Sequence, residues 1–148
     1  MKKYSRFETV FMILLVLLIS CCSKTDRDEA KLQYNAQASN SNRQAVIGDL
    51  YYLASLAKDF YKKPINNNGG GNSWSSNVDN VGNWLGFEYN TSTKKLSSEN
   101  GTFELSINRD VLTIVGTGTE KGGDSTNNVK ATITIKGATS RPEIKVNN

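Results

Sequence analysis

The 148-residue sequence predicts an α+β fold in which one N-terminal amphipathic helix packs on a small antiparallel β-sheet meander. Between residues 43 and 63, large apolar side chains recur every three or four positions, which is the spacing of one helix face. Between residues 85 and 135, apolar and polar side chains alternate in short segments, the period of strands with one buried face. The apolar faces of helix and sheet would then cover each other.

Residues 1–20 have the order of an export signal peptide. Lys2, Lys3 and Arg6 precede an uninterrupted apolar run at residues 10–19, and the small residue Ser20 follows it. A membrane-spanning helix needs about 20 apolar residues, and this run is shorter. We therefore expect the segment to be removed rather than to stay in the membrane.

The end of this run, Leu18-Ile19-Ser20-Cys21, resembles the lipobox of bacterial lipoproteins. The resemblance implies cleavage before Cys21, a diacylglycerol on its sulfur and a further acyl chain such as palmitate on the freed amine. Burial of each CH₂ contributes about 0.8 kcal/mol, so several chains would hold the protein on lipid. The resemblance implies an exported protein that is lipid-anchored to the bacterial cell envelope, and we expect the outer membrane, on its periplasmic or surface face.

The two cysteines, Cys21 and Cys22, are adjacent, and the sequence has no histidine. Cys22 is open to further acylation, to oxidation or to remaining a free thiol. Without histidine or a third cysteine, the pair lacks the ligands of a zinc site. We expect no bound metal and no cofactor.

Residues 21–42 contain few large apolar side chains and are predicted to form a lipid-anchored polar tether. As a coil, residues 23–42 would span about 25 Å, and as a polar extension of the following helix about 30 Å. Both forms stay open at this point.

The predicted helix begins near Arg43, with Ser41 or Asn42 as its N-cap. It ends before Pro64, because proline disfavours helical geometry in the residue that precedes it. The residues expected on its buried face are Val46, Leu50, Leu53, Ala57 and Phe60.

A glycine-rich stretch at residues 65–74 is predicted to be a loop. Such a stretch also invites a phosphate-binding interpretation. That function needs a strand before the loop, a helix after it and a Lys-Ser/Thr pair, and the sequence pattern indicates none of them.

The C-terminal half is predicted to contain four strands, with Asn108-Arg109-Asp110 as a short hairpin between the second and third. Residues 116–128 form a longer link to the fourth. The domain is predicted to cover residues 43–138, and the tail at 139–148 is expected to be loose unless Ile144 and Val146 add an edge strand. The alternating apolar residues are Leu85, Phe87 and Tyr89; Phe103, Leu105 and Ile107; Leu112 and Ile114; Val129, Ala131, Ile133 and Ile135.

A helix, a glycine-bearing loop and an antiparallel meander are the plan of type IV pilin-like domains, which residues 40–137 resemble. The resemblance implies a structural or assembly role in the envelope, with protein partners or self-assembly. The chain differs from that family at Phe7-Glu8-Thr9-Val10, and lipobox cleavage would remove the apolar helix that packs in a filament. The sequence words that carry the resemblance are Asn42-Arg43-Gln44-Ala45-Val46-Ile47-Gly48-Asp49-Leu50, Leu53-Ala54-Ser55-Leu56-Ala57, Phe60-Tyr61-Lys62-Lys63-Pro64, Gly69-Gly70-Gly71-Asn72-Ser73-Trp74 and Gly116-Thr117-Gly118-Thr119-Glu120.

Composition argues against two other classes of function. Histidine is absent and both cysteines lie at the anchor, so the sequence offers no neutral-range general base or nucleophile pair, and we expect no enzyme. Loss of residues 1–20 would lower the net charge from +4 to about +2, and we expect no nucleic acid partner.

An alternative function is a lipid-tethered module that binds a glycan or a protein through exposed aromatic side chains. Trp74, Trp84, Tyr51 and Tyr52 are large amphipathic groups near the glycine-rich loop and are the candidate ligand contacts. Packing in the core is the competing interpretation of both tryptophans.

Overall fold

The computed structural model describes residues 24–74 and 78–147. The predicted signal peptide at residues 1–20, Cys21 and Cys22 lie outside this range. The chain divides into two compact units, residues 1–35 and 36–148. The elements are α2 (Lys24–Lys62), the 3₁₀ turn η1 (Ile65–Asn67), α3 (Val78–Trp84), β1 (Glu88–Asn90), β2 (Lys95–Ser98), β3 (Gly101–Asn108), β4 (Val111–Lys121), β5 (Asn128–Lys136) and β6 (Glu143–Val146).

Helix α2 begins earlier than the sequence pattern predicted. Ser41 and Asn42 lie inside the helix, so their prediction as N-caps is wrong, and the helical alternative for residues 21–42 holds from Lys24 on. Residues 24–42 contain neither glycine nor proline and include strong helix formers such as Ala30, Lys31 and Leu32, so nothing stops the helix there.

Within the first unit, the described segment Lys24–Asn35 is helical, and every side chain from Arg27 on is exposed. Leu32 and Tyr34 are 67% and 73% exposed. None of the described helices combines the length and the apolar content that a bilayer crossing requires.

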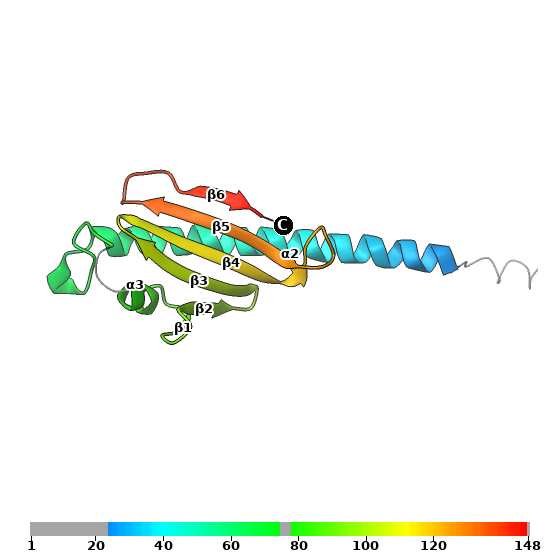
Figure 1. The fold of residues 1–148 in the computed structure, drawn as a ribbon, viewed down its shortest axis with the longest axis horizontal. Helices are drawn as coiled ribbons and strands as arrows, with labels where there is room; N and C mark the ends of the chain where they lie inside the picture. Colours follow the sequence, from blue (N-terminus) through cyan, green and yellow to red (C-terminus); the bar gives the residue numbers. More distant parts are fainter. Residues whose placement is uncertain (1–23, 75–77, 148) are drawn as a thin grey trace, which may run out of the picture. The chain divides into compact units, whose positions relative to one another are not determined.

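The second unit has an α+β fold of two layers. Six antiparallel strands follow one another in chain order from β1 to β6, and they lie as one layer over the C-terminal part of α2 (Figure 1). In the central pairs, Leu105 lies opposite Ile114 and Leu112 opposite Ile135. The meander expected from the sequence is therefore confirmed.

The edges of the sheet differ from the prediction. Ile144 and Val146 belong to β6, which pairs with β5, so the optional edge strand exists. The first predicted strand is wrong at its start, because Leu85 directly follows the unpredicted helix α3 and only Glu88–Asn90 pair as β1. Strand β2 was also missed, since it is short and contains one buried residue, Leu96.

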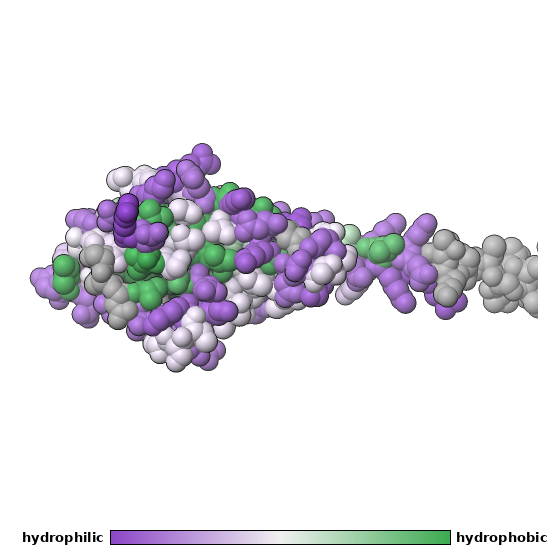
Figure 2. Space-filling model, viewed as in Figure 1, coloured by the Kyte–Doolittle hydropathy of each residue, from purple (hydrophilic) through white to green (hydrophobic). Residues whose placement is uncertain are grey.

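The core lies between α2 and one face of the sheet. All five residues expected on the helix face are buried, and they share one cluster with inward residues of the strands such as Phe103, Ile114 and Ile133. Along β3, β4 and β5, burial alternates from residue to residue. The opposite sheet face is largely hydrophilic or near neutral, with apolar residues between (Figure 2).

Two glycines in β4 let the helix approach the sheet closely. A Cβ at Gly116 would lie 2.8 Å from Val46 Cγ1, and one at Gly118 would collide with Asn42 Oδ1. The two glycines of the Gly116-Thr117-Gly118 segment thus have a packing role at this helix–sheet contact.

Candidate functional site: a polar pocket beside Trp84

The glycine-rich loop folds back onto the C-terminal end of α2. The N–H groups of Gly70, Gly71 and Asn72 donate to the carbonyl oxygens of Phe60, Lys63 and Tyr61 at 2.7, 2.8 and 2.7 Å. Carbonyls at the end of a helix lack the N–H partner that a further turn would supply. Of the three, the carbonyl oxygen of Phe60 also accepts from the N–H of Lys63 at 3.2 Å. The loop is therefore a C-terminal cap.

The glycines of this cap are required by geometry. A Cβ at Gly69 would collide with the backbone of Lys63, and Gly71 has φ of +58°, in the left-handed region. The donor groups at residues 70–72 are already bonded within the chain. The loop thus does not present these amides to a phosphate group.

Helix α3 places Trp84 against the last turns of α2. The indole Nε1–H of Trp84 donates to the carbonyl oxygen of Leu56 at 3.2 Å, and its ring lies 6.1 Å from the ring of Phe60. Val81 of α3 and Leu85, which directly follows the helix, are buried in the core. The orientation of the indole ring is therefore set by contacts on both elements.

A pocket of about 570 Å³ lies between this helix and the capping loop. Its apolar wall includes Phe60, Trp84 and the exposed side chain of Ile65. The remaining polar lining includes four asparagines, which carry both donors and acceptors: Asn67, Asn68, Asn80 and Asn83.

Lys63 is the charged residue in the pocket lining, and its Nζ lies 4.1 Å from the centroid of the Trp84 ring. An ammonium over an indole face is stabilised by about 0.5–1 kcal/mol at an exposed site. Because this energy is small and the lysine side chain is long and flexible, another group can replace the ammonium over the ring.

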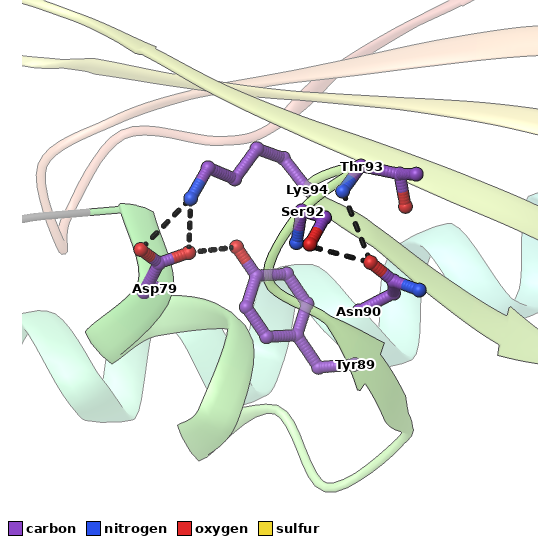
Figure 3. A network of polar contacts seen from close by, with 6 residues as sticks. All are labelled: Asp79, Tyr89, Asn90, Ser92, Thr93 and Lys94. Atoms are coloured by element: carbon purple, nitrogen blue, oxygen red, sulfur yellow. Dashed lines mark hydrogen bonds and ion pairs between the residues drawn. The ribbon is translucent and has the colours of Figure 1, made fainter.

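Asp79 directly precedes the pocket residue Asn80 in the sequence, but its carboxylate is bound by residues outside the pocket. It accepts hydrogen bonds from Lys94 Nζ at 2.7 and 2.8 Å and from the Tyr89 hydroxyl at 2.6 Å (Figure 3). The turn before Lys94 is closed by Asn90, whose Oδ1 accepts from the N–H groups of Ser92 and Thr93, each at 3.0 Å. This network connects α3 to the turn between β1 and β2.

Burial raises the pKa of the Tyr89 hydroxyl well above its ordinary value of 10.0. The hydrogen bond to the Asp79 carboxylate and the negative charge of that group raise it further. Tyr89 therefore stays a hydrogen-bond donor through the neutral and mildly alkaline range.

Of the four aromatic residues predicted as ligand contacts, Trp84 is the one that lines this pocket. Trp74 is 1% exposed and packs on Tyr61 at 4.7 Å between ring centroids, so its prediction as an exposed contact is wrong. Tyr51 and Tyr52 are 52% and 57% exposed on α2, and Tyr52 lies edge-on to Phe87.

Sequence reasoning missed the asparagines and Lys63. Two of the asparagines, Asn80 and Asn83, are three residues apart in α3, a spacing that puts side chains on one helix face. That spacing was available in the sequence, but the helix itself was not predicted. Asn67 and Asn68 reach the same pocket only because the loop folds back on α2.

In the described part of the chain, no group of three or more Asp, Glu, Cys or His side chains is placed to hold a metal ion. What the pocket offers is an aromatic surface, amide donors and acceptors, and one cation. These groups suit reversible binding of a polar molecule.

No family model matches the chain, and searches of curated proteins and of solved structures give no match either. The resemblance to type IV pilin-like proteins thus rests on short sequence segments and on the order of the helix, loop and strands.

Proposed function

We propose that this chain is a lipid-anchored lipoprotein of the bacterial cell envelope, held by acylated Cys21, with a structural or assembly role for its pilin-like domain. The observation that carries the assembly role is the exposed first part of α2. From residue 27 to residue 37 every side chain is exposed, although the backbone is helical. A helical surface of this kind is available to neighbouring molecules.

The charge of this segment supports an anchor made of acyl chains. Three cations, Lys24, Arg27 and Lys31, balance three anions, Asp26, Asp28 and Glu29. A balanced segment gains little from an anionic membrane surface, whereas a basic cluster gains about 1 kcal/mol per cation. Attachment through lipid on Cys21 would not need that attraction.

The apolar side chains of the segment support contact with neighbouring proteins. Leu32 and Tyr34 are both largely exposed and two positions apart, so they point to different sides of the helix. Several neighbouring helical segments would contact both side chains, whereas a single flat partner would contact one. We therefore propose assembly with several neighbours, in the outer membrane, through this part of α2.

Site-specific photo-cross-linking tests the assembly role. A photo-reactive amino acid replaces Tyr34 in the full-length chain, which is expressed in a bacterial envelope together with a differently tagged copy. We expect adducts of discrete mass that contain a second copy or another envelope protein, and fewer of them when Leu32→Asp is added. The matched control carries the probe at Tyr51, which is also exposed and aromatic but lies on the folded domain. Monomer alone from position 34, or the same adducts from position 51, would contradict the proposal.

A further inference from the structure

We propose that the pocket beside Trp84 binds a neutral saccharide. The proposal goes beyond the assembly role and does not depend on it, because all of the lining residues belong to the folded second unit. A volume of about 570 Å³ lies within the range of about 300–1,000 Å³ that small-molecule pockets occupy. A short oligosaccharide therefore has room to enter.

The chemistry of the two walls matches the two kinds of surface on a sugar. A pyranose ring has an apolar face of C–H groups, and the electron-rich face of an indole attracts such groups. The Trp84 ring is held in place by the hydrogen bond of its Nε1–H to Leu56, so the stacking surface is already formed.

Sugar hydroxyls are both donors and acceptors, and so are the side-chain amides of asparagine. Asn80 and Asn83 come from α3, and Asn67 and Asn68 from the capping loop, so the amides surround the pocket from two elements. Each of these side chains is solvent-exposed and therefore free to adapt to a ligand.

Charge disfavours a cationic ligand. No carboxylate is found among the residues that line the pocket in the described structure, and Lys63 would repel a cation. The pocket also lies at the C-terminal end of α2, where the partial negative charge of the helix dipole offsets part of the attraction of Lys63 for an anion.

Lys63 lies over the Trp84 ring, with its Nζ 4.1 Å from the ring centroid. Because the ammonium group is strongly hydrated and its side chain is flexible, it can return to solvent when a sugar ring takes the indole face. The lysine would then border the pocket without contributing to the stacking surface.

The test is a titration of the ¹⁵N-labelled full-length chain in detergent, followed by the indole N–H signals of Trp74 and Trp84, its two tryptophans. The probes are maltotriose and tri-N-acetylchitotriose, which are neutral, and trigalacturonate, which is anionic. With at least one neutral probe, we expect a saturable shift of the Trp84 signal, with a dissociation constant on the order of 1 mM, while the buried Trp74 signal stays in place. Trp84→Phe assigns the two signals.

Two further variants separate binding from folding. Asn83→Ala removes an exposed amide from the pocket and should weaken binding about two- to tenfold, without changing the circular dichroism spectrum. Tyr51→Ala removes an exposed aromatic side chain outside the pocket and should leave binding unchanged. The proposal is overturned if neither neutral probe shifts the Trp84 signal, if only trigalacturonate does, or if folded Asn83→Ala and Tyr51→Ala bind alike.

Discussion

Gly118 of β4 lies directly against Asn42 of α2, so close that a methyl group on the glycine would collide with Asn42 Oδ1. The same asparagine joins the helix to the turn between β2 and β3 and to strand β4. Its Nδ2 donates to the carbonyl oxygen of Asn100 at 3.0 Å, and its Oδ1 accepts from the N–H of Glu120 at 3.3 Å. This contact explains why a residue expected to begin the helix is instead used in its middle.

Gly118→Ala should therefore destabilise the fold. The added methyl group displaces Asn42 and its hydrogen bonds, and overpacking of this kind costs about 1–3 kcal/mol. Urea denaturation of the full-length chain measures the free energy of unfolding. The control is Gly48→Ala in α2, where a Cβ would meet nothing within 4 Å. That change should stabilise by about 0.5–1 kcal/mol, and equal effects of the two substitutions would contradict the packing described for Gly118.

The capping loop yields a second stability prediction. Gly69→Ala would place a methyl group against the backbone of Lys63 and push the loop away from the end of α2. We expect a loss of about 1–3 kcal/mol and faster amide exchange at Gly70 and Gly71, whose N–H groups donate to the helix end. Native-like exchange at those two amides would show that the loop does not depend on the glycine.

Trp74 and Tyr51 should respond differently to truncation. Trp74→Ala removes a buried ring from the core and should lower the free energy of unfolding by about 3–5 kcal/mol. Tyr51→Ala changes an exposed side chain and should stay within about 0.5 kcal/mol of wild type. Thermal unfolding of both variants checks this contrast, which a comparable effect of the two changes would refute.

The raised pKa of Tyr89 leads to a prediction of how the free energy of unfolding changes at alkaline pH. Because its pKa is raised in the folded state, the unfolded chain releases this proton first as pH increases. The stability that Tyr89 contributes is complete below pH 10.0, its ordinary pKa, and is lost as pH rises above it. Urea denaturation from about pH 8 to about pH 11 should show a steeper decline for wild type than for Tyr89→Phe. Parallel declines would mean that Tyr89 ionises equally in both states.

Much of the fold is readable from side-chain periodicity. The three- and four-residue spacing from Val46 to Phe60 predicted the buried face of α2, and alternation along residues 103–135 predicted β3, β4 and β5. Helix α3 escaped prediction because it is one short element that contains Gly82, a poor helix former. The glycine is needed there because a Cβ would collide with the Tyr89 ring.

The candidate site was less predictable than the fold. Trp84 was predicted as a ligand contact because it is a large amphipathic aromatic residue. The same reasoning selected Trp74, which is buried in the core. The pocket depends on a loop that returns to the end of α2 through backbone hydrogen bonds of Gly70 and Gly71. Such contacts between distant backbone groups leave no periodic pattern in the sequence.

The intact mass of the protein extracted from membranes tests the proposed anchor most directly. We predict a chain that begins at Cys21 and carries covalent acyl chains, whereas the double variant Cys21→Ala, Cys22→Ala, which has no cysteine left to acylate, should lack them and retain residues 1–20. A wild-type protein without acyl chains, or one that still contains residues 1–20, would contradict the proposal of a lipid-anchored envelope protein.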